Sequence, residues 1–315
     1  MTVTAPPLGR QGVGLLSAEQ VRELASLRPK DRVGNWAYLA VTWLVIAGAF
    51  TAAGLYRHWW VLVLAFLVIS SRQQSLLNIE HDCIHASFTR DKRRDQLVGI
   101  IACASPCGSP WHATRARHLA HHRLITTPDD PDLPLHDTAD KASKWALVRY
   151  FGLGLLGGYA VMVLLSGAPS NVDAKDKIRD LRNLALSQLV IWGATWAAFG
   201  EWWLYLALWV LPLITLTTVC HLIRSFVEHA VLTDERPDHD NLLVSISSNP
   251  LELAFLAPFN MNYHAEHHLY PAVPARRLPD VRVALADSPQ PPRLIRSAYL
   301  TALLRYAGSL GGRSA

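Results

Sequence analysis

Residues 59–85 read WWVLVLAFLVISSRQQSLLNIEHDCIH, an apolar run that leads directly into two histidines. The run from Trp59 to Ile79 is long enough to cross the roughly 30 Å of bilayer hydrocarbon, because an α-helix rises about 1.5 Å per residue. No glycine or proline separates this run from His81 and His85, so we expect one helix to continue through both. Their spacing places both imidazoles on one helix face. The stretch therefore predicts a membrane helix that ends in two potential metal ligands.

Three further apolar segments are predicted to cross the membrane. They are Trp36–Tyr56, Leu184–Phe199 and Trp202–Ile223. Half of the 315 residues are apolar and only 17% are charged, which is typical of a membrane protein. The pair Gly200-Glu201 between the last two segments favours a tight helical hairpin. The sequence thus predicts an all-α integral membrane protein with four transmembrane helices.

Two more groups of histidines have helical spacing. Residues 118–122 read HLAHH and residues 264–268 read HAEHH, and in each group the three imidazoles share one side of a helix. A ninth histidine, His229, lies just beyond the last predicted span. Nine imidazoles are more than one metal ion needs, so we expect two ions with four or five nitrogens each. Imidazole binds iron, zinc, copper and nickel, and the ligand type alone does not identify the metal.

A joint site for these histidines restricts the topology. Trp145–Leu165 is also apolar, but if it crossed the membrane, the first and last histidine groups would lie on opposite faces. We therefore expect it to lie along the membrane interface or beside the helical bundle. The two predicted outer turns carry only Arg57 and Glu201 as charged residues, whereas residues 90–149 carry ten lysines and arginines. The positive-inside rule places both termini and a helical cap with the histidine groups in the cytoplasm.

Composition narrows the function class further. The net charge of +5 comes from lysines and arginines that flank the apolar spans, so we attribute it to membrane orientation and expect no nucleic-acid partner. The four cysteines form no CxxC pair, and we expect free thiols. A metal transporter is a less favoured alternative, as is a non-catalytic metal-binding membrane protein. A transporter needs ionisable groups near the midplane of its spans, and spans one, three and four have none there.

Side chains near the histidine groups are candidates for holding the imidazoles in place. A carboxylate that accepts the second ring N–H of a liganding histidine fixes its tautomer. The carboxylates in or beside the groups are Glu80, Asp82, Asp132, Glu228 and Glu266. Among the other histidines, His58 is expected to anchor at the interface, and His136 and His239 to be solvated. Whether His112 and His221 contribute to the site stays open.

These groups together resemble the membrane fatty acid desaturase superfamily, which includes acyl hydroxylases, alkane hydroxylases and carotenoid ketolases. The resemblance covers about residues 36–280. It rests on HDCIH at 81–85, on Arg117–His122 followed by TPDDPD at 127–132, on Arg224–His229, and on NYHAEHHLYP at 262–271 with Val273-Pro274. It implies a di-iron centre that uses O₂. The ligands it implies are His81, His85, His118, His121, His122, His229, His264, His267 and His268.

The resemblance also implies a domain layout and a reaction. We expect a cytoplasmic N-terminal segment at 1–35, a desaturase-like membrane domain at 36–280 and a cytoplasmic C-terminal tail at 281–315. The expected reaction is O₂-dependent desaturation or hydroxylation of a fatty acyl or other lipid chain. A carotenoid ketolase or hydroxylase, or an alkane-type hydroxylase, is the alternative. A cofactor must supply the oxidant, because no side-chain base can cleave an unactivated C–H bond.

One position departs from part of the family. Acyl-CoA desaturases have an asparagine four residues before the isolated histidine, where this chain has Ser225, so Ser225 and Glu228 become candidates for a supporting role there. The chain has neither a cytochrome b₅ signature nor a ferredoxin cysteine pattern. We therefore expect electrons from a separate ferredoxin, rubredoxin or similar protein with its reductase.

Overall fold

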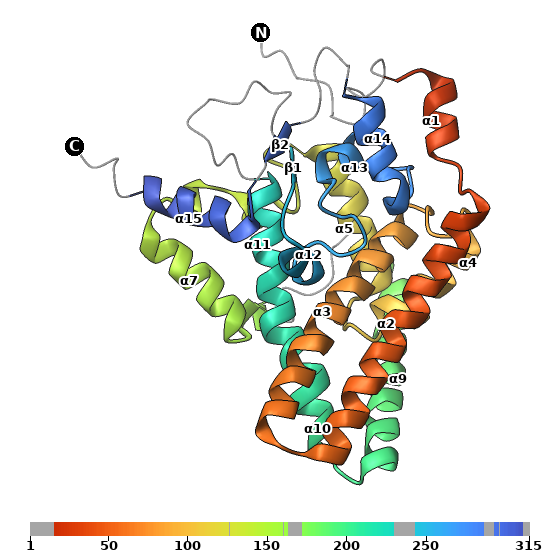
Figure 1. Cartoon of the computed structure of the whole chain (residues 1–315), viewed down its shortest axis with the longest axis vertical. Coiled ribbons are helices and arrows are strands. Elements are labelled where there is room, and N and C mark those ends of the chain that lie inside the picture. The colour runs from red at the N-terminus through yellow and green to blue at the C-terminus, as the bar shows by residue number, and fades with distance from the viewer. Residues whose placement is uncertain are drawn as a thin grey trace.

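The computed structural model of the chain describes residues 16–125, 127–159, 161–162, 172–229, 243–286, 293–295 and 297–310. Within these residues, three helices are long and apolar enough to cross a membrane: Pro29–Tyr56, Trp59–Ile84 and Trp203–His229. They form the lower part of the molecule, with most of the shorter elements gathered above them (Figure 1). Three of the four predicted spans therefore correspond to helices of suitable length and composition.

Helices α2 (Pro29–Tyr56) and α3 (Trp59–Ile84) form an antiparallel hairpin at the turn Arg57-His58. As predicted, α3 continues without interruption from its apolar run through His81. Its second half is rich in buried polar residues such as Gln73 and Asn78, which indicates that this half is enclosed by protein. The two predicted outer turns lie together, because Arg57 Nη1 is 2.7 Å from Glu201 Oε1.

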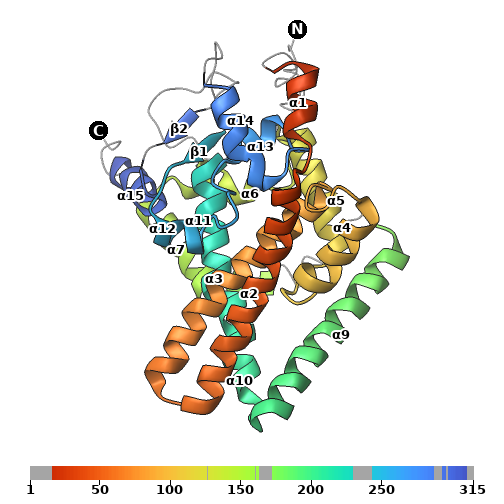
Figure 2. The same ribbon diagram turned by 45° about the vertical axis from the view of Figure 1, so that its right-hand side comes forward.

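The predicted span Leu184–Phe199 lies within α9 (Ala174–Phe199), which ends at Gly200 in the left-handed conformation with φ 70°. The first turns of α9 carry the charged sequence AKDKIRDLR, and α9 is not among the three helices that meet the criteria for a span. In Figure 2, α9 runs down to the same end of the molecule as the α2–α3 turn. The four-span topology remains a prediction.

The helix Trp203–His229 contains two π-helical segments between its α-helical ends. It consists of α10 (Trp203–Tyr205), η4 (Leu206–Val210), η5 (Leu213–Thr217) and α11 (Thr218–His229). A π-turn displaces carbonyls from the regular α-helical pattern, and π-bulges are frequent at functional sites. Here Gln73 Nε2 of α3 donates to the Trp209 carbonyl at 2.8 Å, and Thr217 Oγ1 donates to Gln73 Oε1 at 3.0 Å. These bonds hold α3 to the helix that ends at His229.

The apolar segment Trp145–Leu165 begins with helix α7 (Lys144–Leu155). Twelve residues span about 18 Å at 1.5 Å per residue, which is too short to cross the membrane. α7 packs beside α11, in line with the expected position beside the bundle. Residues 160 and 163–165 of the predicted segment lie outside the described residues.

The remaining elements are short. They are α1 (Ala18–Leu24), α4 (Lys92–Val98), η2 (Gly99–Ala104), α5 (Trp111–Leu124), α6 (Leu133–His136), η3 (Ala139–Lys141), α12 (Pro250–Phe255), α13 (His264–Leu269), η6 (Ala275–Arg277), α14 (Leu278–Ala284) and α15 (Tyr299–Ser309). β1 (Val244–Ile246) and β2 (Arg293–Ile295) form a parallel pair that the sequence did not predict. With three residues each, these strands are too short to show a sequence periodicity.

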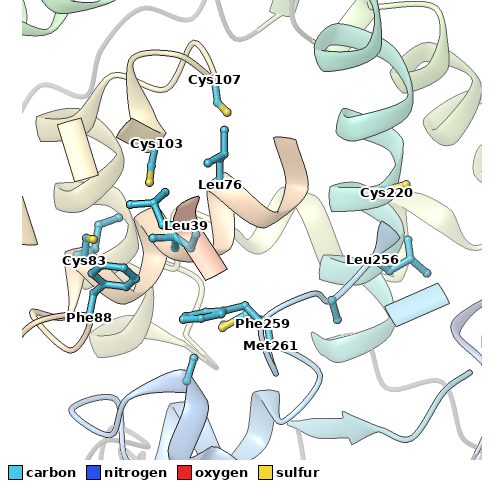
Figure 3. Packing of buried hydrophobic residues seen from close by; sticks show 14 of the residues in the cluster. Leu39, Leu76, Cys83, Phe88, Cys103, Cys107, Cys220, Leu256, Phe259 and Met261 are labelled. Carbon is cyan, nitrogen blue, oxygen red and sulfur yellow. The ribbon is translucent and has the colours of Figure 1, made fainter. Parts of the chain in front are cut away.

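One large hydrophobic core joins the long helices to the elements above them. Figure 3 shows part of it, with Leu39 and Leu76 from the hairpin and Phe259 and Met261 from the segment after α12. All four cysteines are buried in this core as free thiols, as predicted.

The close approach of α9 to α2 can be tested at Gly54. A Cβ atom at Gly54 would overlap the ring of Phe199, whereas one at Gly48 of the same helix would meet no atom within 4 Å. We expect Gly54→Ala to destabilise the protein by on the order of 1–3 kcal/mol, since the overlap forces the helices apart. Gly48→Ala is the matched control and should preserve or raise stability. Thermal unfolding in detergent measures both, and equal midpoints would contradict the α2–α9 contact.

Candidate metal centre

Helices α3 and α5 carry the first two histidine groups. His81 lies in the last turn of α3 and His85 caps that helix. On α5, His118 and His122 are four residues apart and share a face, while His121 between them points to a different neighbour. Ring centroids of His81 and His118 are 4.5 Å apart, so the two helices bring their histidines into direct contact.

Helices α11 and α13 complete the arrangement. His229 is the last residue of α11, and α13 begins at His264. The His267 ring faces His81 at a centroid distance of 4.3 Å, whereas His264 faces His229 at 4.4 Å. Histidines on two neighbouring faces of α13 therefore contact histidines of two different helices, α3 and α11.

All nine predicted ligands lie together and divide into two groups. In the first, the ligand atoms lie within 4.8 Å of one another and come from His81, His85, His118, His122 and His267. The second holds His121, His229 and His268 under the same limit, and His264 joins it because its Nε2 is 2.8 Å from His229 Nε2. Five and four nitrogens match the expectation of two ions with four or five each.

The contacts within the first group cannot all be hydrogen bonds. His118 Nε2 lies 2.8 Å from His85 Nε2 and 3.0 Å from His122 Nε2, and His122 Nε2 is also 3.0 Å from His267 Nε2. A neutral imidazole has one N–H and one acceptor nitrogen. Because each Nε2 acts either as a single donor or as an acceptor, at most two of these three contacts can be satisfied. A cation bound by all four nitrogens removes the conflict.

Several ring nitrogens are buried without any hydrogen-bond partner. They include His81 Nδ1 and both nitrogens of His268. Leaving such a group unsatisfied costs about 1–3 kcal/mol, so unpaired buried nitrogens need an explanation. A metal ligated by His268 supplies one. The donor set therefore fits a pair of metal ions.

Electrostatics keep the imidazoles in the form that binds metals. Burial, reinforced by the charge of Arg115, lowers the pKa of His85 to about 3. Burial also lowers the pKa of His118 and His267 well below the usual value, with neighbouring imidazoles adding to the shift. The rings are therefore neutral near pH 7, and a neutral imidazole is the liganding species.

The predicted supporting side chains have different positions. Glu228 Oε2 lies 3.2 Å from His264 Nδ1. Asp82 instead accepts from Ser87 Oγ and the Ala275 backbone N–H, and Glu80 accepts from Ser109 Oγ. Glu266 pairs with Ser245 and Arg282.

Asp132 and Ser225 support the liganding imidazoles less closely than predicted. Asp132 pairs with Arg117 at 2.5 Å and stays 3.8 Å from His121 Nδ1. Ser225 is half-buried on α11, next to the buried Arg224, and no imidazole contact defines a role for it.

Asp130, which was not among the predicted supporting carboxylates, holds His121. Its Oδ1 is 2.9 Å from His121 Nδ1, and its Oδ2 is 3.3 Å from His136 Nε2. Burial alone would raise the pKa of Asp130, but hydrogen bonds from both histidines outweigh it and lower the pKa. The sequence signal was the TPDDPD stretch directly after the second histidine group, in which the spacing alone does not distinguish Asp130 from Asp132.

The expectation that His136 is solvated was wrong. Its side chain is only 10% exposed, and its ring stacks on His229 at a centroid distance of 4.8 Å. α6, which ends at His136, packs against α11, and the surrounding Asp and Pro residues gave no sign of this. His112 binds Asp180 of α9 instead of joining either group, and His221 joins neither group; His58 stacks on Trp60 at the far end of α3. His239 lies outside the described residues.

A pocket of about 360 Å³ opens beside the second group. It is lined mostly by apolar side chains and reaches both His136 and His229. The lining residues are Ile125, Thr127, Pro128, Leu133, His136, His229 and Leu243.

Sequence comparison assigns the family. A profile of the family described as fatty acid desaturase matches residues 57–298, well over half of the chain. The chain belongs to the fatty acid desaturase family. The resemblance predicted from the histidine groups is therefore confirmed. Members of this family typically hold a di-iron centre, and the five and four clustered imidazoles provide a donor set of that kind.

Relatives within this desaturase family differ in their reactions. The chain is 29% identical to dihydrorhizobitoxine desaturase from Bradyrhizobium elkanii over 272 residues, which cover 82% of this chain and 76% of that protein. It is 28% identical to a beta-carotene ketolase from a Paracoccus species over 78% of this chain and 94% of the ketolase. A sn-1 oleoyl-lipid 12-desaturase from Synechocystis is 24% identical, with 88% and 86% covered. Family membership thus establishes a desaturase-type oxidoreductase without naming the reaction.

The role of Asp130 leads to a prediction. Asp130→Asn removes the charged acceptor behind His121 and should lower metal affinity by roughly 10–100-fold, the usual effect of losing a partner that orients a ligand. Iron retention during dialysis against a chelator measures the change. Asp129→Asn is the matched control, since Asp129 is exposed and adjacent. Equal iron retention in the two variants would contradict the orienting role of Asp130.

Proposed function

We propose that this protein is a membrane-bound, non-haem di-iron oxidoreductase that uses O₂ to desaturate or hydroxylate a fatty acyl or other lipid chain. The observation that carries the proposal is the meeting of nine imidazoles, four buried and five half-buried, in groups of five and four. The first ion would be held by His81, His85, His118, His122 and His267, and the second by His121, His229, His264 and His268. When bound, the iron pair supplies the oxidising power for cleaving a C–H bond.

The chain's own residues position the metals and keep them in an enclosed site. Asp130 and Glu228 lie behind ligands of the second group, at 2.9 Å from His121 Nδ1 and 3.2 Å from His264 Nδ1. The imidazoles are buried or half-buried, and restricted access of water limits side reactions of an oxidising centre. Rigid support of the ligands from behind preserves an arrangement that a substrate carbon must approach closely.

The substrate side of the proposal rests on the apolar pocket. Ile125, Leu133 and Leu243 line it next to His229, so a hydrocarbon chain finds apolar contacts up to the second group. Apolar walls with a few polar groups are typical of sites for such ligands. We propose that the chain enters from the membrane or the cytoplasmic interface and presents a methylene to the metals.

The proposed topology places this site at the cytoplasmic side. The turns that carry Arg57 and Glu201 are then the outer ends of four spans, and the histidine groups and both termini are cytoplasmic. Electrons would come from a separate donor such as a ferredoxin or rubredoxin with its reductase. Lys92, Arg93 and Arg94 are exposed at the start of α4 and offer a basic surface for an acidic donor.

A carotenoid ketolase or hydroxylase is the second candidate. It is favoured by one observation, the alignment that covers 94% of the length of a Paracoccus ketolase. Both candidates use the same metal centre, so the length and shape of the pocket would decide between them.

Product analysis tests the proposed function. Iron-loaded protein in lipid nanodiscs, supplied with ferredoxin, its reductase and NADPH, is given acyl lipids or β-carotene under isotopically labelled O₂. Loss of two hydrogens from an acyl chain without label indicates desaturation, one labelled oxygen on the chain indicates hydroxylation, and a labelled carotenoid supports the second candidate.

Two variants serve as controls for the same assay. His267→Ala should abolish product formation and lower bound iron, while His58→Ala should retain both, because His58 lies at the opposite end of α3. Iron-loaded wild type that oxidises neither substrate class with any donor would contradict the proposed function.

A further inference from the structure

The C-terminal helix α15 (Tyr299–Ser309) begins directly after the region that matches the family, which ends at residue 298. It packs against α11, the helix that ends at His229 (Figure 1). Tyr299 is fully buried, although it belongs to the segment predicted as a tail. An element outside the family match thus reaches toward the metal centre.

Tyr299 is joined to the second histidine group through one carboxylate. Its hydroxyl donates to Glu228 Oε1 at 2.7 Å. The other oxygen, Oε2, accepts from Arg224 Nε at 2.9 Å and lies 3.2 Å from His264 Nδ1. Glu228 is only 1% exposed, so its orientation depends on these protein partners and not on solvent.

Both partners of Glu228 are themselves fixed. Arg224 Nη1 donates to Asn78 Oδ1 of α3 at 2.9 Å. The start of α15 is held by Glu252 of α12, which accepts from the backbone N–H groups of Tyr299 at 2.7 Å and Leu300 at 3.2 Å. The hydrogen bonds to Glu252 therefore fix the start of α15, and with it the Tyr299 hydroxyl that donates to Glu228.

We infer that Tyr299 is a positioning residue of the metal centre, which holds Glu228 so that this carboxylate orients His264 for metal binding. The 3.2 Å contact is close enough for a hydrogen bond, but the His264 ring is not aligned for one. If Nε2 of His264 bound a metal, the ring proton would be on Nδ1, the nitrogen that lies beside Glu228. A carboxylate behind a liganding imidazole fixes its tautomer and strengthens its binding. The inference rests on the proposed di-iron function.

The test is site-selective release of iron from the holoenzyme. Release to a chelator is followed in time, and Mössbauer spectra of the remaining iron separate the two sites, which His85→Ala and His229→Ala assign. Tyr299→Phe removes only the hydroxyl, and we expect it to speed release from the four-histidine site by roughly 10–100-fold while the five-histidine site stays unchanged. Glu228→Gln should act in the same direction, and the double variant should release iron no faster than the faster single variant.

Tyr306→Phe is the matched control on the same helix, because its hydroxyl lies 3.3 Å from the Lys141 carbonyl, away from Glu228. Thermal midpoints of the variants show whether each is folded. Unchanged release in Tyr299→Phe, equal acceleration at both sites, or the same acceleration in Tyr306→Phe would overturn the inference and leave the proposed function intact. Wild-type protein that holds no pair of irons would overturn both.

Discussion

Mutual contact among nine buried or half-buried imidazoles is the constraint on which the rest of the structure depends. Nε2 atoms at 2.8–3.0 Å cannot all be paired by single N–H groups, and both nitrogens of His268 are buried without a partner. Such an arrangement is unfavourable unless cations bind the nitrogens. It also determines the architecture, because the ligands come from four separate segments, which must bring their histidines to the same region of the structure. The unbroken course of α3 through His81, the position of His229 on α11 and the contacts of α13 with both histidine groups follow from this requirement.

Two ligands of the second histidine group, His121 and His264, each have a carboxylate beside Nδ1 of the ring. Asp130 holds His121 and also His136, and Glu228 lies behind His264 while it is held by Arg224 and Tyr299. These partners come from segments far apart in the chain, so the geometry of the metal centre depends on the packing of the whole cap. Buried polar networks that are fully paired tend to specify one arrangement.

Local periodicity explains which features were predictable from the sequence. A spacing of four places His118 and His122 on one face, and an apolar run without glycine or proline predicts α3, so both are predictable from the sequence. Features that depend on tertiary contacts were not. Asp130 and Asp132 are equivalent in sequence, and only the fold of their loop selects Asp130. The buried position of His136 and the approach of Tyr299 to Glu228 depend on contacts between distant segments, and the three-residue strands of β1 and β2 are too short to leave a pattern.

The central claim is that two irons bind, one in each histidine group. The most direct measurement is elemental analysis of protein purified in mild detergent under iron-replete conditions, combined with Mössbauer spectroscopy of the same sample. The proposed binding of two irons predicts about two irons per chain with the signature of a coupled pair, as expected for ligand sets of five and four imidazoles. A single metal per chain, or zinc that persists and supports no O₂ consumption with any electron donor, would contradict it.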